Sequence, residues 1–310
     1  VRGEIMLNEI WSEIVAFDKI IIHRHVSPDP DALGSQLGLA ALIHENYPEK
    51  FVKTVGFTEP SLAWMGVMDE VKDEEYEGAL VFVMDTANSA RIDDGRFKLG
   101  AKLIKLDHHP VVEDYADLNY VNTNATATSE IVVSLFLANK EQYDLKMSLE
   151  AAQHLYTGII ADSGRFLYDN TTTATLGAAS FLYDCGIDRN KIHELLYRRP
   201  LNIVQAQGFV LSQFEVSEAG VAYFKMSKDV QDSYGLTTGT RSALVNFENE
   251  DGRIRANIRS NGPIINEVAA RFEGGGHPKA SGAIVKAWDD CQALLDELEQ
   301  VCHTYVKELN

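Results

Sequence analysis

Acidic and imidazole side chains recur in short, separated motifs along the first half of the chain. The first motif, HRHVSPDPDALGS, carries His25, Asp29 and Asp31. Three later motifs, VFVMDTA, KLIKLDHHP and GIIADSGRF, add Asp85, His108 and Asp162. Carboxylate oxygens and imidazole nitrogens are ligands for divalent cations, and two such cations close together can hold a phosphate group. The motifs therefore predict a dinuclear metal site with phosphate-ester chemistry.

Taken singly, each motif also has a structural explanation. Asp-Pro-Asp is a common solvated turn, and an isolated aspartate often caps a helix. However, Asp29 and Asp31 would point the same way in an extended segment, and two such carboxylates repel unless a cation lies between them. The adjacent His108 and His109 that follow Asp107 are uncommon in a purely structural role. In combination, the motifs favour the metal site.

The motifs follow apolar segments that have the composition of buried β-strands. Three such runs occupy residues 20–22, 79–84 and 101–106. The second and third end directly at Asp85 and Asp107, and a helical pattern over 148–161 leads to Asp162. Apolar strands that alternate with helices are typical of an α/β domain with a parallel, doubly wound sheet, which binds ligands beyond the carboxyl ends of its strands. We expect the motifs to meet at that edge.

The remainder of the chain has a different character. Segment 187–206, which carries Arg198, Arg199 and Pro200, is expected to be a linker. It would join a catalytic domain over 1–186 to a smaller α+β domain over 207–310. Strand-like runs in the second domain occupy 209–217, 220–227, 242–249 and 253–260. A helix around 264–272, a Gly-rich loop and an amphipathic terminal helix would complete it.

Candidate phosphate-binding residues lie in this second domain. In RIRANIRS, strand alternation places the polar residues on one face, which are Arg253, Arg255, Asn257 and Arg259. Guanidinium groups match phosphate oxygens bidentately. A solvated sheet face explains the first two arginines equally well. Arg259, followed by Ser260 at the strand end, is the stronger candidate.

A second candidate for substrate binding is the glycine run that follows. Glycines let the backbone approach a ligand closely and can present amides to an anion. Three glycines alone often form only a loop, but His277 and Lys279 come directly afterwards. The segment therefore predicts an anion or nucleobase site at Gly274, Gly275, Gly276 and His277. Arg165 and Phe166 remain ambiguous, because an aromatic residue there is as often part of a core.

Composition limits the partners. The chain has 310 residues, 45% of them hydrophobic, and a net charge of −18. This charge disfavours long duplex nucleic acid, which usually binds a basic stripe, and favours small phosphorylated substrates. Three sparse cysteines and the absence of a membrane-spanning apolar run predict a cytoplasmic protein without membrane association. A homodimer is one option for its assembly.

The order of the motifs resembles the DHH phosphoesterase superfamily. That order is His-x-x-x-Asp-x-Asp, then Asp, then Asp-His-His, then Asp. The run from Gly274 to His277, followed by Ala280-Ser281-Gly282, resembles the GGGH type of the DHH-associated C-terminal domain. The resemblance covers nearly the whole chain. In its two-domain length, the chain is similar to the bifunctional nanoRNase (oligoribonuclease) and pAp-phosphatase group.

The resemblance implies specific roles. His25 and Asp29 would bind one metal, and Asp31, His108 and Asp162 the second, with Asp85 bridging both. Asp107 would orient an imidazole, and His109 would contact the scissile phosphate. The substrate would be held by Arg259, Ser260 and the GGGH segment. Two divalent ions are expected, with Mn²⁺ favoured and Mg²⁺, Co²⁺ or Fe²⁺ as alternatives.

The expected activity is hydrolysis of short RNA or DNA oligonucleotides, of dinucleotides such as pApA and of 3′,5′-adenosine bisphosphate (pAp) by metal-activated water. Three alternatives stay open. One is an inorganic pyrophosphatase or exopolyphosphatase with the same metal core, although pyrophosphate needs no arginine- and glycine-rich nucleotide domain. A processive exonuclease would usually carry a further nucleic-acid-binding module. The last is a nucleotide-sensing module without catalysis, against which the complete ligand set argues.

Overall fold

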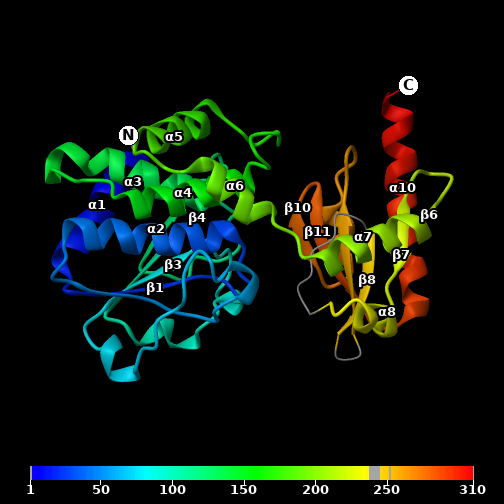
Figure 1. The fold of residues 1–310 in the computed structure, drawn as a ribbon, viewed down its shortest axis with the longest axis horizontal. Helices are drawn as coiled ribbons and strands as arrows, with labels where there is room; N and C mark the ends of the chain where they lie inside the picture. Colours follow the sequence, from blue (N-terminus) through cyan, green and yellow to red (C-terminus); the bar gives the residue numbers. More distant parts are fainter. Residues whose placement is uncertain (1, 237–244, 251–252, 310) are drawn as a thin grey trace. The chain divides into compact units, whose positions relative to one another are not determined.

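The chain folds into two compact units. The computed structural model of the protein describes residues 2–236, 245–250 and 253–309 (Figure 1). Unit 1 covers Val1–Arg198 and unit 2 covers Arg199–Asn310. The division falls within the segment expected to be a linker, 187–206. That segment holds helix α6 (Arg189–Tyr197) and the first turns of α7 (Leu201–Gln213).

Unit 1 is built on a five-stranded parallel sheet with the order β2-β1-β3-β4-β5. Its strands are β1 (Lys19–His23), β2 (Phe51–Thr54), β3 (Leu80–Met84), β4 (Lys102–Asp107) and β5 (Leu118–Val121). The chain runs outward from β1 to β2 and then returns to the other side of β1. The strand order therefore reverses between β1 and β3, which is where parallel sheets open a crevice beyond the strand ends. The predicted parallel α/β fold is confirmed.

The two faces of this sheet are covered differently. One face, including Ile22, Phe82 and Leu106, shares a core with α-helices that lie together on one side of the sheet (Figure 1). Those helices are α1 (Arg2–Ala16), α2 (Pro30–Asn46), α3 (Thr128–Tyr143), α4 (Leu149–Asp162), α5 (Thr173–Asp184) and α6. The opposite face, including Ile21 and Val83, packs on residues of short 3₁₀ segments and loops. The 3₁₀ segments of unit 1 are η1 (Pro60–Leu62), η2 (Asp73–Tyr76), η3 (Ser89–Arg91) and η4 (Gly95–Leu99).

Helices α2 and α4 pack closely through glycines. A Cβ added at Gly34 of α2 would lie 2.6 Å from the carbonyl oxygen of His154 and 3.0 Å from the nitrogen of Gly158. Gly38, one turn later, is packed against the side chain of Leu155. Because α2 begins at the predicted metal loop and α4 ends at Asp162, this contact fixes the distance between two parts of the site.

Unit 2 contains a six-stranded sheet with the order β10-β11-β9-β8-β7-β6. Its pairs are antiparallel except β7 with β8. The strands are β6 (Glu215–Val216), β7 (Ala222–Lys225), β8 (Val245–Glu250), β9 (Arg253–Arg259), β10 (Gly275–His277) and β11 (Ala280–Val285). The helical segments are α7, α8 (Lys228–Ser233), α9 (Asn266–Arg271), η5 (Trp288–Asp290) and α10 (Cys291–Leu309). A smaller domain of mixed composition was expected and is confirmed.

Two local predictions for unit 2 are wrong. Residues 209–217 lie mostly in α7, because Ala206 and Val210 are buried four residues apart on one side of that helix. Only Glu215–Val216 form a strand there. The expected Gly-rich loop is partly the edge strand β10, which pairs with β11. Of the predicted strand over 242–249, residues 242–244 lie outside the described residues.

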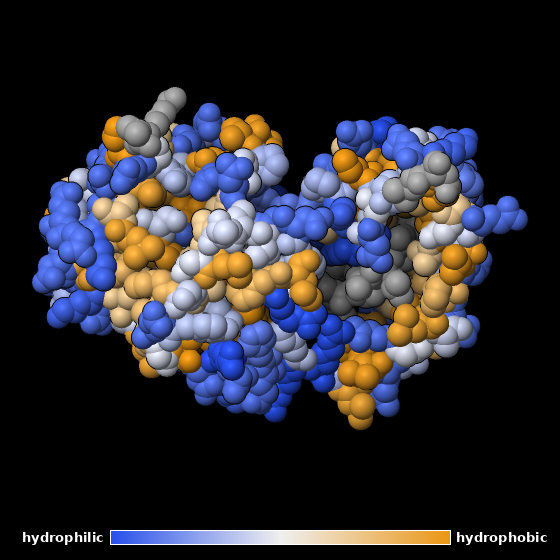
Figure 2. Space-filling view, turned by 90° about the horizontal axis from the view of Figure 1, so that it is seen from above, coloured by the Kyte–Doolittle hydropathy of each residue, from blue (hydrophilic) through white to orange (hydrophobic). Residues whose placement is uncertain are grey.

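The described part of the chain contains no helix that is both long and apolar enough to cross a membrane. On the face shown in Figure 2, hydrophobic residues are interspersed with hydrophilic ones. The expected cytoplasmic location stays a prediction.

The glycine contact between α2 and α4 can be tested by substitution with alanine. We expect Gly34→Ala to lower the free energy of unfolding by about 1–3 kcal/mol, because the added methyl group overlaps the backbone of α4. Gly177→Ala in α5 is the matched control, because a Cβ there meets no atom within 4 Å. It should raise stability by up to about 1 kcal/mol through helix propensity. Urea unfolding measures both, and equal effects would contradict the packing argument.

Candidate metal centre

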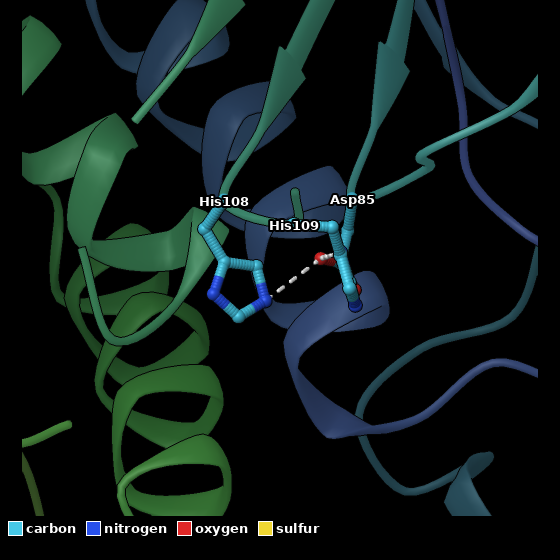
Figure 3. A group of neighbouring side chains, drawn as sticks. All are labelled: Asp85, His108 and His109. Atoms are coloured by element: carbon cyan, nitrogen blue, oxygen red, sulfur yellow. Dashed lines mark ion pairs between the residues drawn. The ribbon is translucent and has the colours of Figure 1, made fainter. Parts of the chain in front are cut away.

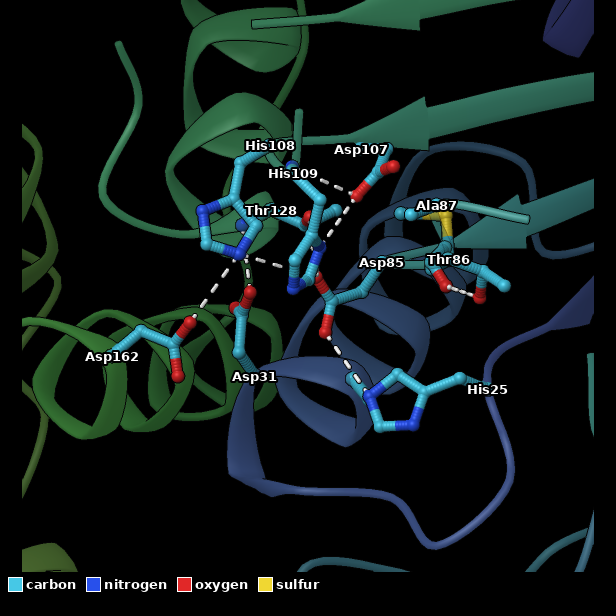
Figure 4. Close-up of polar contacts among 12 residues, drawn as sticks. His25, Asp31, Asp85, Thr86, Ala87, Asp107, His108, His109, Thr128 and Asp162 are labelled. Atoms are coloured by element: carbon cyan, nitrogen blue, oxygen red, sulfur yellow. Dashed lines mark hydrogen bonds and ion pairs between the residues drawn. The ribbon is translucent and has the colours of Figure 1, made fainter. Parts of the chain in front are cut away.

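The predicted metal ligands come together at the carboxyl edge of the unit 1 sheet (Figure 4). Their potential ligand atoms form two groups, and within each group these atoms lie within 4.8 Å of one another. The first group is His25, Asp29 and Asp85, and the second is Asp31, His108 and Asp162. A third group joins Asp85 to His108 and His109 (Figure 3).

Asp85 lies between the two groups. Its Oδ2 is 3.4 Å from Nε2 of His25, and its Oδ1 is 3.4 Å from Nε2 of His108. The residue adopts a left-handed backbone conformation with a φ of 54°, which aspartate tolerates better than most residues. Burial alone would raise the pKa of Asp85. The hydrogen bond with His25 and the charges of His109 and His108 outweigh burial and hold the pKa below its usual range.

The two aspartates of the first motif are not arranged as expected. The extended Asp-Pro-Asp geometry is wrong because α2 begins at Pro30, a residue favoured in the first helical turn. Asp29 is the N-cap, and its Oδ1 accepts hydrogen bonds from the backbone N–H groups of Asp31 and Ala32 at 3.1 and 3.0 Å. Asp31 lies within the helix. This local helix places the two carboxylates in different ligand groups.

Asp31 is held by a second helix terminus. Its Oδ2 and Oδ1 accept hydrogen bonds from the backbone N–H groups of Thr128 and Ser129, at 2.7 and 3.0 Å, in the first turn of α3. Helix N-termini favour negative charge. Even so, burial, followed by the charge of Asp85, raises the pKa of Asp31 well above its usual value. A cation at this position would relieve that cost.

Thr128 and Ser129 are functional residues that the sequence reasoning missed. Beyond holding Asp31 with its backbone, Thr128 donates a hydrogen bond from Oγ1 to Oδ1 of Asp85 at 3.0 Å. A signal existed, since Thr-Ser-Glu before an apolar run marks a helix start. Gly158 of α4 is also required, because a Cβ there would lie 2.1 Å from Oγ of Ser129 and 2.6 Å from Oδ1 of Asp31.

Each of the three histidines has an acceptor oxygen next to its Nδ1. The partners are the carbonyl oxygen of Val26 for His25 (2.8 Å), that of Ala125 for His108 (3.3 Å) and Oδ1 of Asp107 for His109 (2.9 Å). Such an acceptor assigns the proton to Nδ1 in a neutral ring, so that Nε2 is the nitrogen with a lone pair. For His25 and His108 this nitrogen faces the carboxylates, as a metal ligand requires.

The electrostatic environments of the imidazoles differ. Burial lowers the pKa of His108, which keeps the ring neutral and able to bind a cation. For His109, burial is outweighed by the hydrogen bond with Asp107 and by the charge of Asp85, and the pKa is raised to about 9. The pKa of His25 is also raised, because the hydrogen bond with Asp85 and the charge of Asp29 outweigh the effect of burial.

Lys105 is a further residue that the sequence analysis did not identify. Its side chain and that of Asp107 are both fully buried, with Nζ 3.3 Å from Oδ2 of Asp107. Nζ also donates hydrogen bonds to the carbonyl oxygens of Ala87 and Glu113. Asp107 in turn accepts from the backbone N–H of His109 at 3.1 Å as well as facing its ring. The lysine thus fixes the carboxylate that orients His109.

The predicted substrate residues belong to unit 2. Ala280 of β11 pairs with Arg259 of β9 on one side and with His277 of β10 on the other. Directly opposed residues in antiparallel strands share a face, so Arg259 and His277 project from the same exposed face. The Ser260 hydroxyl is engaged locally, donating to the carbonyl oxygen of Pro263 and accepting from the N–H of Gly262.

The glycine run has distinct structural requirements. A Cβ at Gly274 would lie 2.0 Å from the carbonyl oxygen of Gly282, and Gly276 has a φ of 135°, so neither position suits another residue. A Cβ at Gly275 would meet no atom within 4 Å. The first and third glycines are therefore explained by packing and backbone geometry, and only Gly275 leaves space beside the backbone.

The donor set of unit 1 fits a metal ion. Carboxylates and imidazoles converge without thiolates, and the three cysteines, Cys185, Cys291 and Cys302, belong to none of the ligand groups. This combination suits divalent cations of hard or intermediate character. A two-domain phosphoesterase with an Asp/His metal centre is the class of protein that this fold and site define.

Comparisons with known proteins agree with this class. A family model described as the DHH family, N-terminal domain, matches residues 19–159, and one described as the DHHA1 domain matches 228–304. The chain is 44% identical to the bifunctional oligoribonuclease and PAP phosphatase NrnA of Bacillus subtilis (strain 168), covering 96% of this chain and 99% of the relative. It is 43% identical to the probable NrnA of Streptococcus mutans, covering 94% and 97%.

Among solved structures, an exopolyphosphatase-related protein from Bacteroides fragilis is 25% identical with a TM-score of 0.83. The match covers 97% of this chain and 96% of that protein. The chain belongs to the DHH family of phosphoesterases, as the order of its motifs predicted.

The Lys105–Asp107 pair can be tested by a double-mutant cycle. Lys105→Met should lower the free energy of unfolding by about 3–5 kcal/mol, because it leaves the Asp107 carboxylate buried without its cation. In an Asp107→Asn background the same substitution should cost less, by a coupling energy of about 0.5–3 kcal/mol. Chemical denaturation of the four proteins measures this difference. Strictly additive losses would show that Lys105 acts independently of Asp107.

Proposed function

We propose that the protein hydrolyses short oligonucleotides, including dinucleotides such as pApA, and 3′,5′-adenosine bisphosphate. The observation that carries the proposal is the pair of Asp/His ligand groups joined through Asp85. It is supported by 44% identity, over 96% of the chain, to a relative named as an oligoribonuclease and PAP phosphatase. The net charge of −18 further favours short substrates over long duplexes.

The site would hold two divalent cations, with Mn²⁺ favoured over Mg²⁺, Co²⁺ and Fe²⁺ by the mixed donor set. His25 and Asp29 would bind one cation, and Asp31, His108 and Asp162 the other. Asp85, which lies between the two groups, would help to hold both cations. When bound, two such cations activate water and neutralise charge on a phosphate.

His109 and Asp107 would act on the substrate side of the reaction. With a pKa of about 9, His109 carries a positive charge near neutral pH and can donate a hydrogen bond to a phosphate oxygen. Asp107 fixes the orientation of the ring through the bond to Nδ1 at 2.9 Å. We assign catalytic phosphate contact to His109 and a positioning role to Asp107.

Unit 2 would recognise the rest of the substrate. Arg259 and His277 project from one exposed face on either side of Ala280. Opposed antiparallel residues lie about 5 Å apart, so the two Cα atoms are separated by about 10 Å. This separation suits a nucleotide, with the guanidinium at a phosphate and the imidazole at a neighbouring group. Gly275, which leaves open space, would allow close approach of the ligand.

The proposal is tested with pAp, a labelled RNA dinucleotide, a 24-nucleotide RNA and inorganic pyrophosphate, each with added Mn²⁺. We expect rapid loss of pAp and dinucleotide and slow loss of the long RNA. Asp85→Asn should reduce turnover of every substrate by several orders of magnitude. Asparagine tolerates the left-handed backbone of this position, so the variant should remain folded. Calorimetric titration should find two Mn²⁺ ions per wild-type chain and weaker binding by the variant.

Other outcomes would support one of the alternative functions or contradict the role of Asp85. Cleavage of pyrophosphate alone would move the protein to the pyrophosphatase or exopolyphosphatase alternative. Tight nucleotide binding without hydrolysis of any substrate would support the sensor alternative. Undiminished activity of Asp85→Asn would contradict the shared carboxylate.

A second prediction concerns Arg259. Arg259→Ala should raise KM for pAp about tenfold or more while changing kcat less, because its contact with substrate phosphate is made before and during the reaction alike. Arg253→Ala is a matched control, since that residue lies on the same exposed face of β9 at the opposite end of the strand. Steady-state kinetics compare the variants. A loss confined to kcat would place Arg259 in the chemical step.

A further inference from the structure

A left-handed turn follows directly after the last ligand of unit 1. Helix α4 ends at Asp162. After Ser163, three consecutive residues have positive φ angles, which are 54° for Gly164, 65° for Arg165 and 65° for Phe166. The left-handed conformation costs about 1–2 kcal/mol for each residue with a Cβ. Two adjacent non-glycine residues in this conformation therefore indicate that the surrounding structure enforces the turn, as is common at functional sites.

Buried Ser163 holds the turn together. Its Oγ accepts from the backbone N–H of Phe166 at 3.0 Å, and its carbonyl oxygen accepts from the N–H groups of Leu167 and Tyr168 at 3.0 and 3.1 Å. Phe166 is half-buried and packs against the main core. The turn therefore directs Phe166 inward and leaves Arg165 exposed.

Arg165 is positioned by an aromatic ring. Its guanidinium carbon lies 4.9 Å from the ring centroid of Tyr197 in α6, and that ring is stacked with His193 at 6.0 Å and 25°. Among the described side chains of unit 1, no carboxylate lies at ion-pair distance from Arg165. Other arginines of the chain, such as Arg24 and Arg271, are paired with acidic side chains. A guanidinium held over an aromatic ring by a cation–π contact still has N–H groups that can bind a phosphate.

The turn is also connected by hydrogen bonds to the residues around the second ligand group. Nδ2 of Asn170 lies 3.5 Å from the carbonyl oxygen of Asp162, and the carbonyl oxygen of Asn170 accepts from Oγ1 of Thr126 at 2.7 Å. Thr126 is two residues before Thr128, which contacts both Asp31 and Asp85. The loop that carries Arg165 is thus anchored at both ends beside the second ligand group.

We propose that Arg165 binds a substrate phosphate other than the one at the metal centre, with Tyr197 fixing the guanidinium in advance. This inference rests on the proposed function and specifies its substrate class. Ligands with at least two phosphate groups, such as nucleoside bisphosphates and 5′-phosphorylated dinucleotides, use both the metal centre and Arg165. A substrate with a single phosphate uses only the first.

The test is the selectivity between substrates with two phosphates and one. The numerator is kcat/KM for pAp and the denominator is kcat/KM for bis(p-nitrophenyl) phosphate. Arg165→Asn should lower this ratio about 10–100-fold, mainly through KM for pAp, because charge-assisted hydrogen bonds to one phosphate are lost. Asparagine adopts the left-handed conformation readily, so the turn should persist. Tyr197→Leu should lower the ratio less, and Arg165→Lys should restore part of it.

Arg189→Ala is the control variant, because the guanidinium carbon of Arg189 also lies over a tyrosine ring, 5.8 Å from the centroid of Tyr183. Its ratio should equal that of the wild type. If Arg165→Asn reduces both substrates equally, the turn has only a structural role and the inference is overturned. If the loss requires a nucleobase rather than a second phosphate, the guanidinium is a stacking surface, which also overturns it.

Failure of the proposed function is distinguishable from failure of this inference. If the proposed function is wrong, neither the wild-type protein nor the variants at position 165 hydrolyse pAp. Calorimetric titration of pAp into the wild type and Arg165→Asn then tests the phosphate contact directly. Equal affinities would reject it, and a 10–100-fold weaker variant would retain it as a binding site.

Discussion

The fold of unit 1 is organised around the cost of holding four carboxylates together. Those of Asp29, Asp31, Asp85 and Asp162 share one edge of the sheet, where like charges repel strongly unless they are compensated. The need for this compensation differs among the four carboxylates, because they are buried to different extents. The side chains of Asp29 and Asp162 are 26% and 23% exposed, whereas Asp85 is 1% exposed and Asp31 is fully buried. The two inner carboxylates therefore depend on the protein, and the two outer ones face solvent and an incoming substrate.

The inner carboxylates are stabilised by three elements that meet at one point. The start of α3 donates two backbone N–H groups to Asp31, and imidazoles from two other segments contact Asp85. This convergence requires helices α2, α3 and α4 to approach more closely than side chains normally permit. Glycines supply the missing space, with Gly34 and Gly158 at the α2–α4 contact and Gly158 also beside Asp31. The groups that stabilise the inner carboxylates can therefore reach them only because the helices pack this closely.

The structure brings together the residues that were predicted as ligands, and they could be recognised in the sequence because their chemistry is carried by residue type and spacing. The strands that end at Asp85 and Asp107 were likewise visible as apolar runs. Other features depend on tertiary contacts that leave little local pattern. The 3₁₀ segments on the second face of the sheet are too short for a helical period, and the buried role of Lys105 follows only from its contact with Asp107. The strand predicted at 209–217 failed because a β-branched residue such as Val210 also fits the buried side of α7, beside Ala206.

The acidic charge of the chain and the anionic nature of its proposed substrates are reconciled by local cations. A net charge of −18 disfavours long polyanions at a distance, where the whole charge distribution acts. Salt screens the interactions of a bound phosphate with distant charges, so the charged groups in direct contact with it contribute most to its electrostatic energy. His109 has a raised pKa, and Arg165 is held by an aromatic ring rather than by a carboxylate, so each keeps positive charge available for a phosphate. A short substrate meets these groups while carrying few charges into the repulsive field. The net charge of the chain would therefore act against long substrates electrostatically.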